Sequence, residues 1–338
     1  MTPVCHVRLF QAKTLLLLLT CSAATSASAQ VLHDHDNSPF TTVFGLPDST
    51  EGGAIMGRGQ SGWGALALLA SHSVADAAGD EIFIVDGETS RLEFSYRRGI
   101  GNRWEIGVEL PYMTHQSGGL DSVIEDWHKV FGFPDGPRDD RPRDLIEFLY
   151  AENNIVLADF RDNADGLGDV RLFGGYQLKS TERYRSALRF GVKLPTGDED
   201  LLLGSGGTDV SLGLAGDWVA LGDGGNLSAF YRLNLTYLGE PAFLSDRYEE
   251  FIGQAAAGVT WRVVPAVGLT VQANVRSPLY DSDIEMLGET SASLTFGGDV
   301  RLSDRLSLLI GVGEDIKVGS TPDVSFQLAL QYRPAQSN

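Results

Sequence analysis

The sequence is poor in thiols, in basic residues and in long apolar runs. Its two cysteines are Cys5 and Cys21, and Lys and Arg number 26 against 45 Asp and Glu, a formal net charge of -19 at pH 7. Nucleic-acid binding needs a concentrated basic surface, so this charge argues against a nucleic-acid partner. After Gln30, no stretch is apolar for the ~20 residues that a membrane-spanning helix requires.

The first residues have the form of an export signal. Arg8 and Lys13 provide a basic front, the apolar run Thr14–Leu19 follows, and Ala-Ser-Ala at 27–29 is the small-x-small pattern that a signal peptidase cleaves. We therefore predict a cleaved signal peptide over residues 1–29, and export to the outer membrane of a Gram-negative bacterium. Both cysteines would leave with it, so the exported chain would contain no disulfides.

Cys21 has a second interpretation, as the lipid-attachment cysteine of a lipoprotein. It follows Leu18, Leu19 and Thr20, and threonine fits poorly directly before such a cysteine. A complete cleavage site also follows it, so the signal-peptide interpretation is preferred.

From about Gly62 onward, apolar and polar residues alternate as in a strand with two different faces. Arg91, Glu93 and Arg97, for example, interleave with Leu92 and Phe94. The alternation predicts about twelve strands, near 63–74, 91–97, 104–112, 169–177, 188–194, 210–218, 227–237, 251–263, 267–275, 294–302, 306–312 and 324–332.

The connections between these segments alternate in length, which favours a membrane barrel over a soluble β-sandwich. Short links fall at 99–103, 178–184, 220–226, 263–266 and 303–305. Longer links fall near Ala75–Gly87 and at 114–167, 196–208, 239–250, 277–290 and 314–323. Short periplasmic turns and long extracellular loops are typical of an up-and-down barrel with both termini inside the cell envelope.

Aromatic residues at the strand ends favour the same fold. Amphipathic rings prefer the headgroup layer of a membrane, so we expect two interfacial girdles. Their candidates are Trp63, Tyr96, Trp104, Tyr112, Tyr176, Trp218, Tyr237, Trp261 and Tyr332. The last strand also carries an unbroken apolar face that ends in Tyr332, the kind of signal that the barrel-assembly machinery reads, although a short tail follows it.

The sequence thus predicts an all-β fold, a transmembrane up-and-down antiparallel β-barrel of about 12 strands over residues 62–333, with a short tail at 334–338. The sheet is expected to close into a barrel, because an open sheet edge in hydrocarbon leaves unpaired backbone groups. A barrel of this size should enclose a modest polar lumen. The lumen-lining candidates are Arg91, Glu93, Arg97, Glu105, Glu109, Asp169, Arg171, Arg189 and Lys193.

Residues 30–61 lack alternation and contain Pro39, Pro47 and paired glycines. We expect a periplasmic tail, with a partial plug of the lumen as the alternative. His33-Asp34-His35-Asp36 has metal-ligand chemistry, but adjacent exposed His and Asp in a mobile leader usually bind nothing. We therefore predict no metal and no cofactor.

The link 114–167 is too long for a featureless loop. Leu120, Ile124, Trp127, Val130 and Phe131 recur at helical spacing, which predicts a short amphipathic helix at the mouth or in the pore. The loop also carries both signs of charge around Arg138–Asp144. It either narrows the pore and selects ions, or is a solvated loop held by its own salt bridges.

The acidic cluster 198–200 lies in another long link. It could share Ca²⁺ or Mg²⁺ with lipopolysaccharide, since both ions prefer carboxylate oxygens, but a solvated charge run is the preferred interpretation. Outer-membrane lipids and lipopolysaccharide are in any case the expected surroundings of the barrel.

Three glycine-rich segments resemble a known family. They are Gly166–Leu178 (GLGDVRLFGGYQL), Leu188–Gly197 (LRFGVKLPTG) and Leu203–Gly213 (LGSGGTDVSLG), together with the loop Trp127–Arg143. These resemble the domain of unknown function 3187 family of Gram-negative proteins. The Leu-Pro-Thr-Gly and Gly-Asp-Val elements also occur in broader groups of outer-membrane transporters. The resemblance implies an outer-membrane barrel and supplies no reaction, substrate or catalytic residue.

Three functions fit this fold. The first is a channel or uptake porin for small polar solutes, and the second is a structural or surface-binding barrel with little conductance. The third is a membrane-embedded lipid hydrolase, for which Ser71-His72-Ser73 is the suggestive segment. Adjacent residues of a strand point to opposite faces, so His72 cannot readily activate either serine. We therefore predict a channel without catalytic residues.

Overall fold

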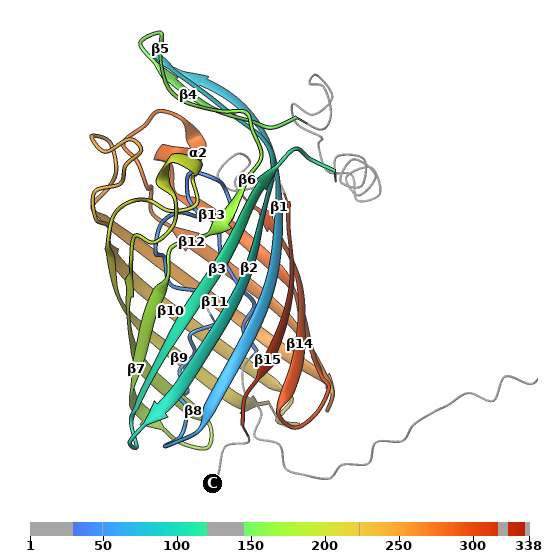
Figure 1. Cartoon of the computed structure of the whole chain (residues 1–338). Helices are drawn as coiled ribbons and strands as arrows, with labels where there is room; N and C mark the ends of the chain where they lie inside the picture. Colours follow the sequence, from blue (N-terminus) through green and yellow to red (C-terminus); the bar gives the residue numbers. More distant parts are fainter. Residues whose placement is uncertain (1–29, 49, 120–144, 223, 317–323, 335–338) are drawn as a thin grey trace, which may run out of the picture.

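The segments of alternating polarity form antiparallel strands that close into a ring. The computed structural model describes residues 30–48, 50–119, 145–222, 224–316 and 324–334. Among these, 12 strands pair with two neighbours each, and β1 closes the ring by pairing with both β2 and β15 (Figure 1). The strands in ring order are β1 (Ser61–Ala78), β2 (Glu81–Ile100), β3 (Trp104–Gln116), β7 (Arg171–Ser180), β8 (Tyr184–Lys193), β9 (Asp209–Leu221), β10 (Leu227–Tyr237), β11 (Phe251–Val264), β12 (Val267–Arg276), β13 (Ser291–Arg301), β14 (Leu306–Asp315) and β15 (Val324–Tyr332).

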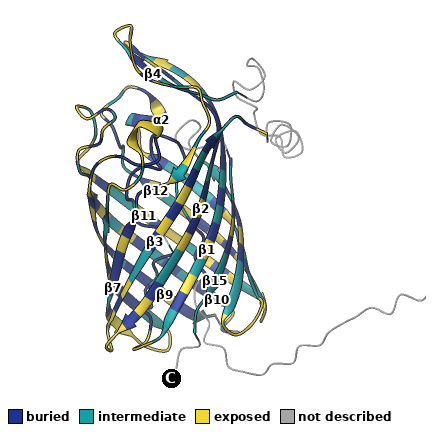
Figure 2. Ribbon diagram, in the orientation of Figure 1, coloured by how far each residue is buried: buried dark blue, intermediate teal, exposed yellow. Residues whose placement is uncertain are grey.

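The two faces of the ring differ in polarity as the alternation predicts. On β2, Leu92 is 57% exposed and Phe94 is 47% exposed, whereas Arg91 and Glu93 between them are buried. Figure 2 shows the same buried and exposed alternation along the other strands of the ring. A hydrocarbon environment requires apolar side chains on the outer face and hydrogen-bond partners for every backbone group. The apolar outer face meets the first requirement and the closed ring meets the second. The predicted transmembrane up-and-down antiparallel barrel is confirmed.

Helical structure is slight. The described residues include the helix α2 (Glu285–Gly288) and the 3-10 turn η2 (Glu199–Leu201). No helix in the described ranges has the length and apolar character needed to cross a membrane.

The two ends of the barrel differ. Short turns join the strands at one end, at 101–103, 181–183, 222–226, 265–266 and 302–305, and we call this the turn end. At the other end, the loop end, lie the connections 194–208, 238–250 and 277–290. Three more strands, β4 (Glu147–Glu152), β5 (Ile155–Phe160) and β6 (Ala164–Leu167), extend β2 and β3 beyond this end (Figure 1).

One predicted long link is wrong. Residues Ala75–Gly87 belong to β1 and β2, which run on past the barrel rim and meet at a tight turn. Gly79 takes a φ of +56° in this turn, a conformation that glycine adopts without steric cost. The helix predicted over 120–131 lies outside the described residues, as do the signal segment 1–29 and residues 335–338 of the tail.

Candidate functional site

The interior of the barrel contains residues 30–60, which we call the inner segment (Figure 1, blue). The Gln30 carbonyl accepts a hydrogen bond of 2.9 Å from Thr260 near the turn end. The Tyr280 hydroxyl donates to the Phe40 carbonyl at 3.0 Å near the loop end. The Gly59 amide then donates to the Gly99 carbonyl at 3.0 Å, back at the turn end. The segment therefore rises through the lumen and returns, as a plug rather than as a free tail.

The rising arm, residues 30–37, is held by side-chain amides of the wall. Gln272 of β12 accepts from the Leu32 amide at 3.1 Å and donates to the Leu32 carbonyl at 3.2 Å. Gln327 of β15 makes the same pair of bonds with the backbone of His33, both at 2.9 Å. Each glutamine thus satisfies one donor and one acceptor of the segment, as a neighbouring strand would do.

The returning arm, residues 45–60, is held mainly by charged groups. Arg189 of β8 donates to the Gly52 and Ala54 carbonyls at 2.9 Å, and also pairs with Glu105 of β3. The second oxygen of Glu105 accepts from the Met56 amide at 2.6 Å. Each of these buried charges therefore has both an ionic partner and a backbone partner, which is what a buried ion pair needs in order to persist.

Two further ion pairs bind the returning arm. Arg171 of β7 bridges Glu51 of the arm and Glu109 of β3, the latter at 3.0 Å. Asp217 of β9 accepts from the Gly53 amide at 2.7 Å and pairs with Arg232 of β10 at 2.8 Å. The arm is thus bound to wall strands that are far apart in the chain.

Gly53 explains why the segment has paired glycines. A Cβ at this position would stand 2.5 Å from the Arg185 carbonyl oxygen and 3.0 Å from the Asp217 amide nitrogen. Both neighbours are backbone atoms of the barrel and cannot move aside. The close approach that allows the Gly53 amide to reach Asp217 therefore requires glycine.

All nine residues predicted to line the lumen are buried. Eight of them take part in ion pairs: Arg91–Glu93 at 2.6 Å, Lys193–Asp169 at 2.8 Å, Arg171–Glu109 and Arg189–Glu105. The ninth, Arg97, lies 5.3 Å from the ring centre of Phe173. Their partners on the inner segment were not predicted.

Several wall residues that hold the segment were missed from the sequence. Asp209, Asp217, Gln272 and Gln327 are buried and bind its backbone. The sequence did contain a signal for them. Each lies at an alternate position of its strand, on the face opposite the apolar residues. Glutamine carries no charge, so the alternation of charged and apolar residues did not single out Gln272 and Gln327.

The turn of the inner segment is covered by an apolar cluster at the loop end. Phe40, Val43 and Phe44 pack there with residues of β2, β4 and the loop around α2. Ring centres lie 5.4 Å apart for Phe40 and Phe83, and 5.8 Å apart for Phe44 and Tyr280. This cluster, which we call the cap, packs over the turn of the inner segment at the loop end.

The cavities left beside the segment are small. One of about 70 Å³ lies beside the rising arm and is lined by His33, His35 and Arg276, among others. Another of about 20 Å³ lies near Trp63 and Glu109. Since one water needs roughly 10–15 Å³ of such space, both cavities have room for water. Among the described residues, His33, His35 and Asp48 form a group that could ligate a metal ion.

The predicted girdle residues lie on the outer surface, exposed or half-buried. Register brings several together near the turn end. Trp63 stands opposite Tyr332 and Tyr96, and Trp104 stands opposite Tyr176, with ring centres 4.8 Å apart in the last pair. Their placement at a headgroup layer stays a prediction.

The segment Ser71-His72-Ser73, considered for lipid hydrolysis, lies in β1 with all three residues buried. His72 stands opposite Gly87 of β2. A lipid at the barrel surface has no direct approach to this histidine.

Comparison with known proteins places the chain in a family. No curated protein matches it. Among solved structures, it is similar to the COG4313 outer membrane channel from Pseudomonas putida F1, with a TM-score of 0.49 and 13% identity over 81% of this chain and 94% of that one. It is also similar to the toluene transporter TbuX of Ralstonia pickettii, with a TM-score of 0.41 and 12% identity over 84% and 92% of the two chains. Residues 9–334 match the family described as "Protein of unknown function (DUF3187)", and the chain is therefore a member of that family and an outer-membrane β-barrel.

Proposed function

We propose that the protein is an outer-membrane channel for small polar solutes, closed by its own inner segment. The proposal rests on the observation that the inner segment fills the lumen. The space inside the ring is occupied by one continuous segment bound to polar and charged wall groups such as Arg189, Asp217 and Gln272. A barrel serving only as a scaffold has no need of a polar wall around a separable segment.

The bonds that hold the segment are of a kind that water can replace. A neutral hydrogen bond contributes only about 0.5–1.5 kcal/mol net, and a bond to a charged group such as Arg189 or Asp217 about 1.5–3 kcal/mol, because water offers partners to both sides when the segment leaves. The wall ion pairs, such as Lys193–Asp169 and Arg232–Asp217, remain paired when it leaves. Displacement would therefore expose a lumen with both signs of charge, suited to polar solutes without strong ion selectivity.

A structural or surface-binding barrel is the second candidate. The apolar cap around Phe40 and Tyr280 favours it, because these residues hold the inner segment at the loop end independently of the wall groups. If the cap and the segment never open, the outer loops rather than the lumen would perform the function.

Single-channel recording separates the two candidates. The exported chain in planar bilayers should be closed most of the time, whereas a variant lacking residues 30–56 should conduct steadily. A synthetic peptide of residues 30–56 should block the truncated barrel again, because the wall groups that bind it are intact. Heat-modifiable migration in electrophoresis would verify that both forms are folded barrels. A folded truncated barrel without conductance would refute the channel proposal.

A further inference from the structure

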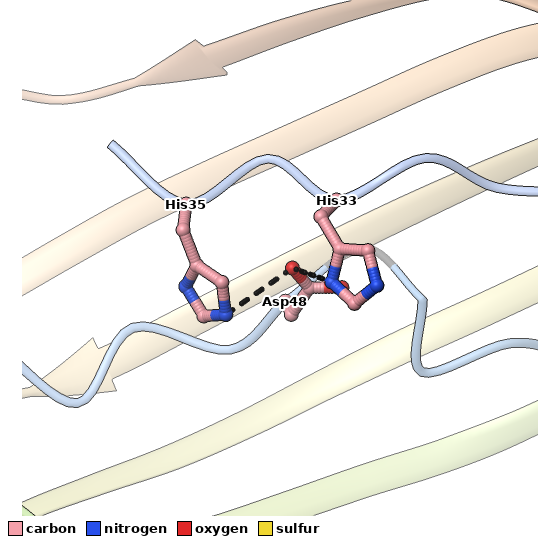
Figure 3. A group of neighbouring side chains, drawn as sticks. All are labelled: His33, His35 and Asp48. Atoms are coloured by element: carbon pink, nitrogen blue, oxygen red, sulfur yellow. Dashed lines mark hydrogen bonds and ion pairs between the residues drawn. The ribbon is translucent and has the colours of Figure 1, made fainter. Parts of the chain in front are cut away.

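Two histidines of the rising arm face one carboxylate of the returning arm. His33 and His35 are two residues apart in the chain, and residues so spaced lie on the same side of an extended segment. Figure 3 shows both rings turned towards Asp48, which comes from the other arm. The group therefore joins the two arms of the inner segment inside the barrel.

We propose that His33, His35 and Asp48 form a binding site for a divalent transition-metal ion, Zn²⁺ or one of similar ligand preference. Asp48 Oδ2 lies 3.1 Å from His33 Nδ1 and 3.3 Å from His35 Nε2, and all three atoms lie within 4.8 Å of one another. In a tetrahedral zinc site with bonds of about 2.0–2.1 Å, ligand atoms stand roughly 3.3 Å apart. Both separations from Asp48 Oδ2 are close to this value.

The second observation is a buried nitrogen without a hydrogen bond. His35 Nε2 is buried and, among the described residues, makes no hydrogen bond, although two carboxylates stand near it. One is Asp48 and the other is Glu93 of β2, whose Oε2 lies 3.7 Å away. A buried polar atom without a hydrogen bond is costly, and coordination to a metal ion would satisfy it.

Charge and ligand type indicate the class of ion. Asp48 and Glu93 contribute two negative charges, and Arg91 at 2.6 Å from Glu93 offsets one of them. Two imidazoles and a carboxylate suit Zn²⁺, Ni²⁺, Cu²⁺ or Co²⁺, whereas Mg²⁺ and Ca²⁺ prefer oxygen ligands alone. The adjoining cavity of about 70 Å³, lined by both histidines, has room for a water as the fourth ligand.

The sequence alone predicted no metal at these residues, and their burial removes the basis of that prediction. That expectation assumed an exposed, mobile leader, whereas His33 and Asp48 are buried and His35 is half-buried. The simpler alternative is a hydrogen-bonded clamp, in which His33 and Asp48 join the arms without a metal. The two interpretations differ at His35, because without a metal its Nε2 only contacts Asp48 Oδ2 at 3.3 Å and makes no hydrogen bond, whereas the metal would use Nε2 as a ligand.

Zn²⁺ titration by calorimetry tests the site on the exported chain, folded in detergent and freed of metal by a chelator. We expect one Zn²⁺ per chain, and a loss of affinity of at least about tenfold in His35→Gln and in Asp48→Asn. Asp34→Asn is the matched control, since it alters a neighbouring acid outside the ligand group and should bind as the unaltered chain does. Co²⁺ bound to the unaltered chain should give the visible absorption of a tetrahedral site.

The Co²⁺ spectrum keeps the test valid if a variant folds poorly. Absence of stoichiometric Zn²⁺ binding to the unaltered chain, or equal affinity in folded His35→Gln, would overturn the proposal. Because binding is measured without transport, the result does not depend on whether the barrel conducts.

Discussion

At the scale of single residues, the interior illustrates how buried charges can be retained without stabilising the fold strongly. Arg189 is 3% exposed and Glu105 is fully buried, so both have lost their hydration. Their mutual attraction and the carbonyls of Gly52 and Ala54 offset that loss. Pairs of this kind contribute little net stability, but removal of one partner leaves the other charged and unpaired, which costs about 3–5 kcal/mol.

Replacing Arg189 with leucine should therefore destabilise the folded protein by about 3–5 kcal/mol, because Glu105 keeps its charge and loses its cation. The double variant Arg189→Leu/Glu105→Gln should be less destabilised than Arg189→Leu alone. Urea unfolding of the barrel in detergent measures both.

Arg161 provides the control for this experiment. Its side chain is 58% exposed and pairs with Glu147 and Asp159 at the protein surface. Water screens exposed pairs, so Arg161→Ala should leave the unfolding midpoint unchanged. Equal stability losses in the single and double Arg189 variants would contradict the unpaired-charge explanation.

At the scale of elements, the strands could be predicted from the sequence, whereas the inner segment was only the alternative to a periplasmic tail. In a strand such as β2, the residue types reflect the two environments of the strand. Leu92 and Phe94 face lipid, whereas Arg91 and Glu93 face inward. The inner segment binds largely through its backbone, as at Gly53, and a backbone hydrogen bond leaves no pattern in residue type. The wall residues indicated a polar lumen, but not which segment would fill it.

The same reasoning explains the error at 75–87. The rule that outward residues are apolar holds only where lipid surrounds the strand. Beyond the rim, β1 and β2 continue with Asp76, Asp80 and Glu81 beside the turn, so polarity no longer separates strand from loop there. The strands continue there because β2 pairs with β4 on the side away from β1.

The cap is the element whose loss should loosen the loop end without opening the ring. Phe40 is fully buried against Phe83 and Phe243. Phe40→Ala should destabilise the cap by about 3–5 kcal/mol, the usual range for removing a buried phenylalanine. Hydrogen exchange should speed up in residues 277–288 and stay unchanged in β12 and β13. Phe251→Ala removes an exposed ring from β11. This control variant should change neither the stability of the cap nor the exchange rate of residues 277–288. Faster exchange throughout the barrel strands would show that the cap and the ring are one cooperative unit.

At the scale of the whole molecule, a closed ring of strands surrounds a segment bound by replaceable contacts. The ring has no free edge, and its hydrogen bonds cannot be lost singly without exposing backbone to lipid. The inner segment has no such restriction, because water can enter where it leaves. The two parts therefore differ in the free energy of opening, and regulation by a ligand would act most readily on the weaker part.

A metal ion that joins the two arms should hold this weaker part closed, if both proposals are correct. His33 and His35 lie on the rising arm and Asp48 on the returning arm, so separation of the arms would break the site. Zn²⁺ at 100 times its dissociation constant would then stabilise the closed state by about 2.7 kcal/mol, which lowers the open probability roughly 100-fold. Single-channel recordings with and without Zn²⁺ measure this, and His35→Gln should abolish the response. Stoichiometric Zn²⁺ binding with an unchanged open probability would leave the metal site intact, and would mean that the channel opens without separating the two arms.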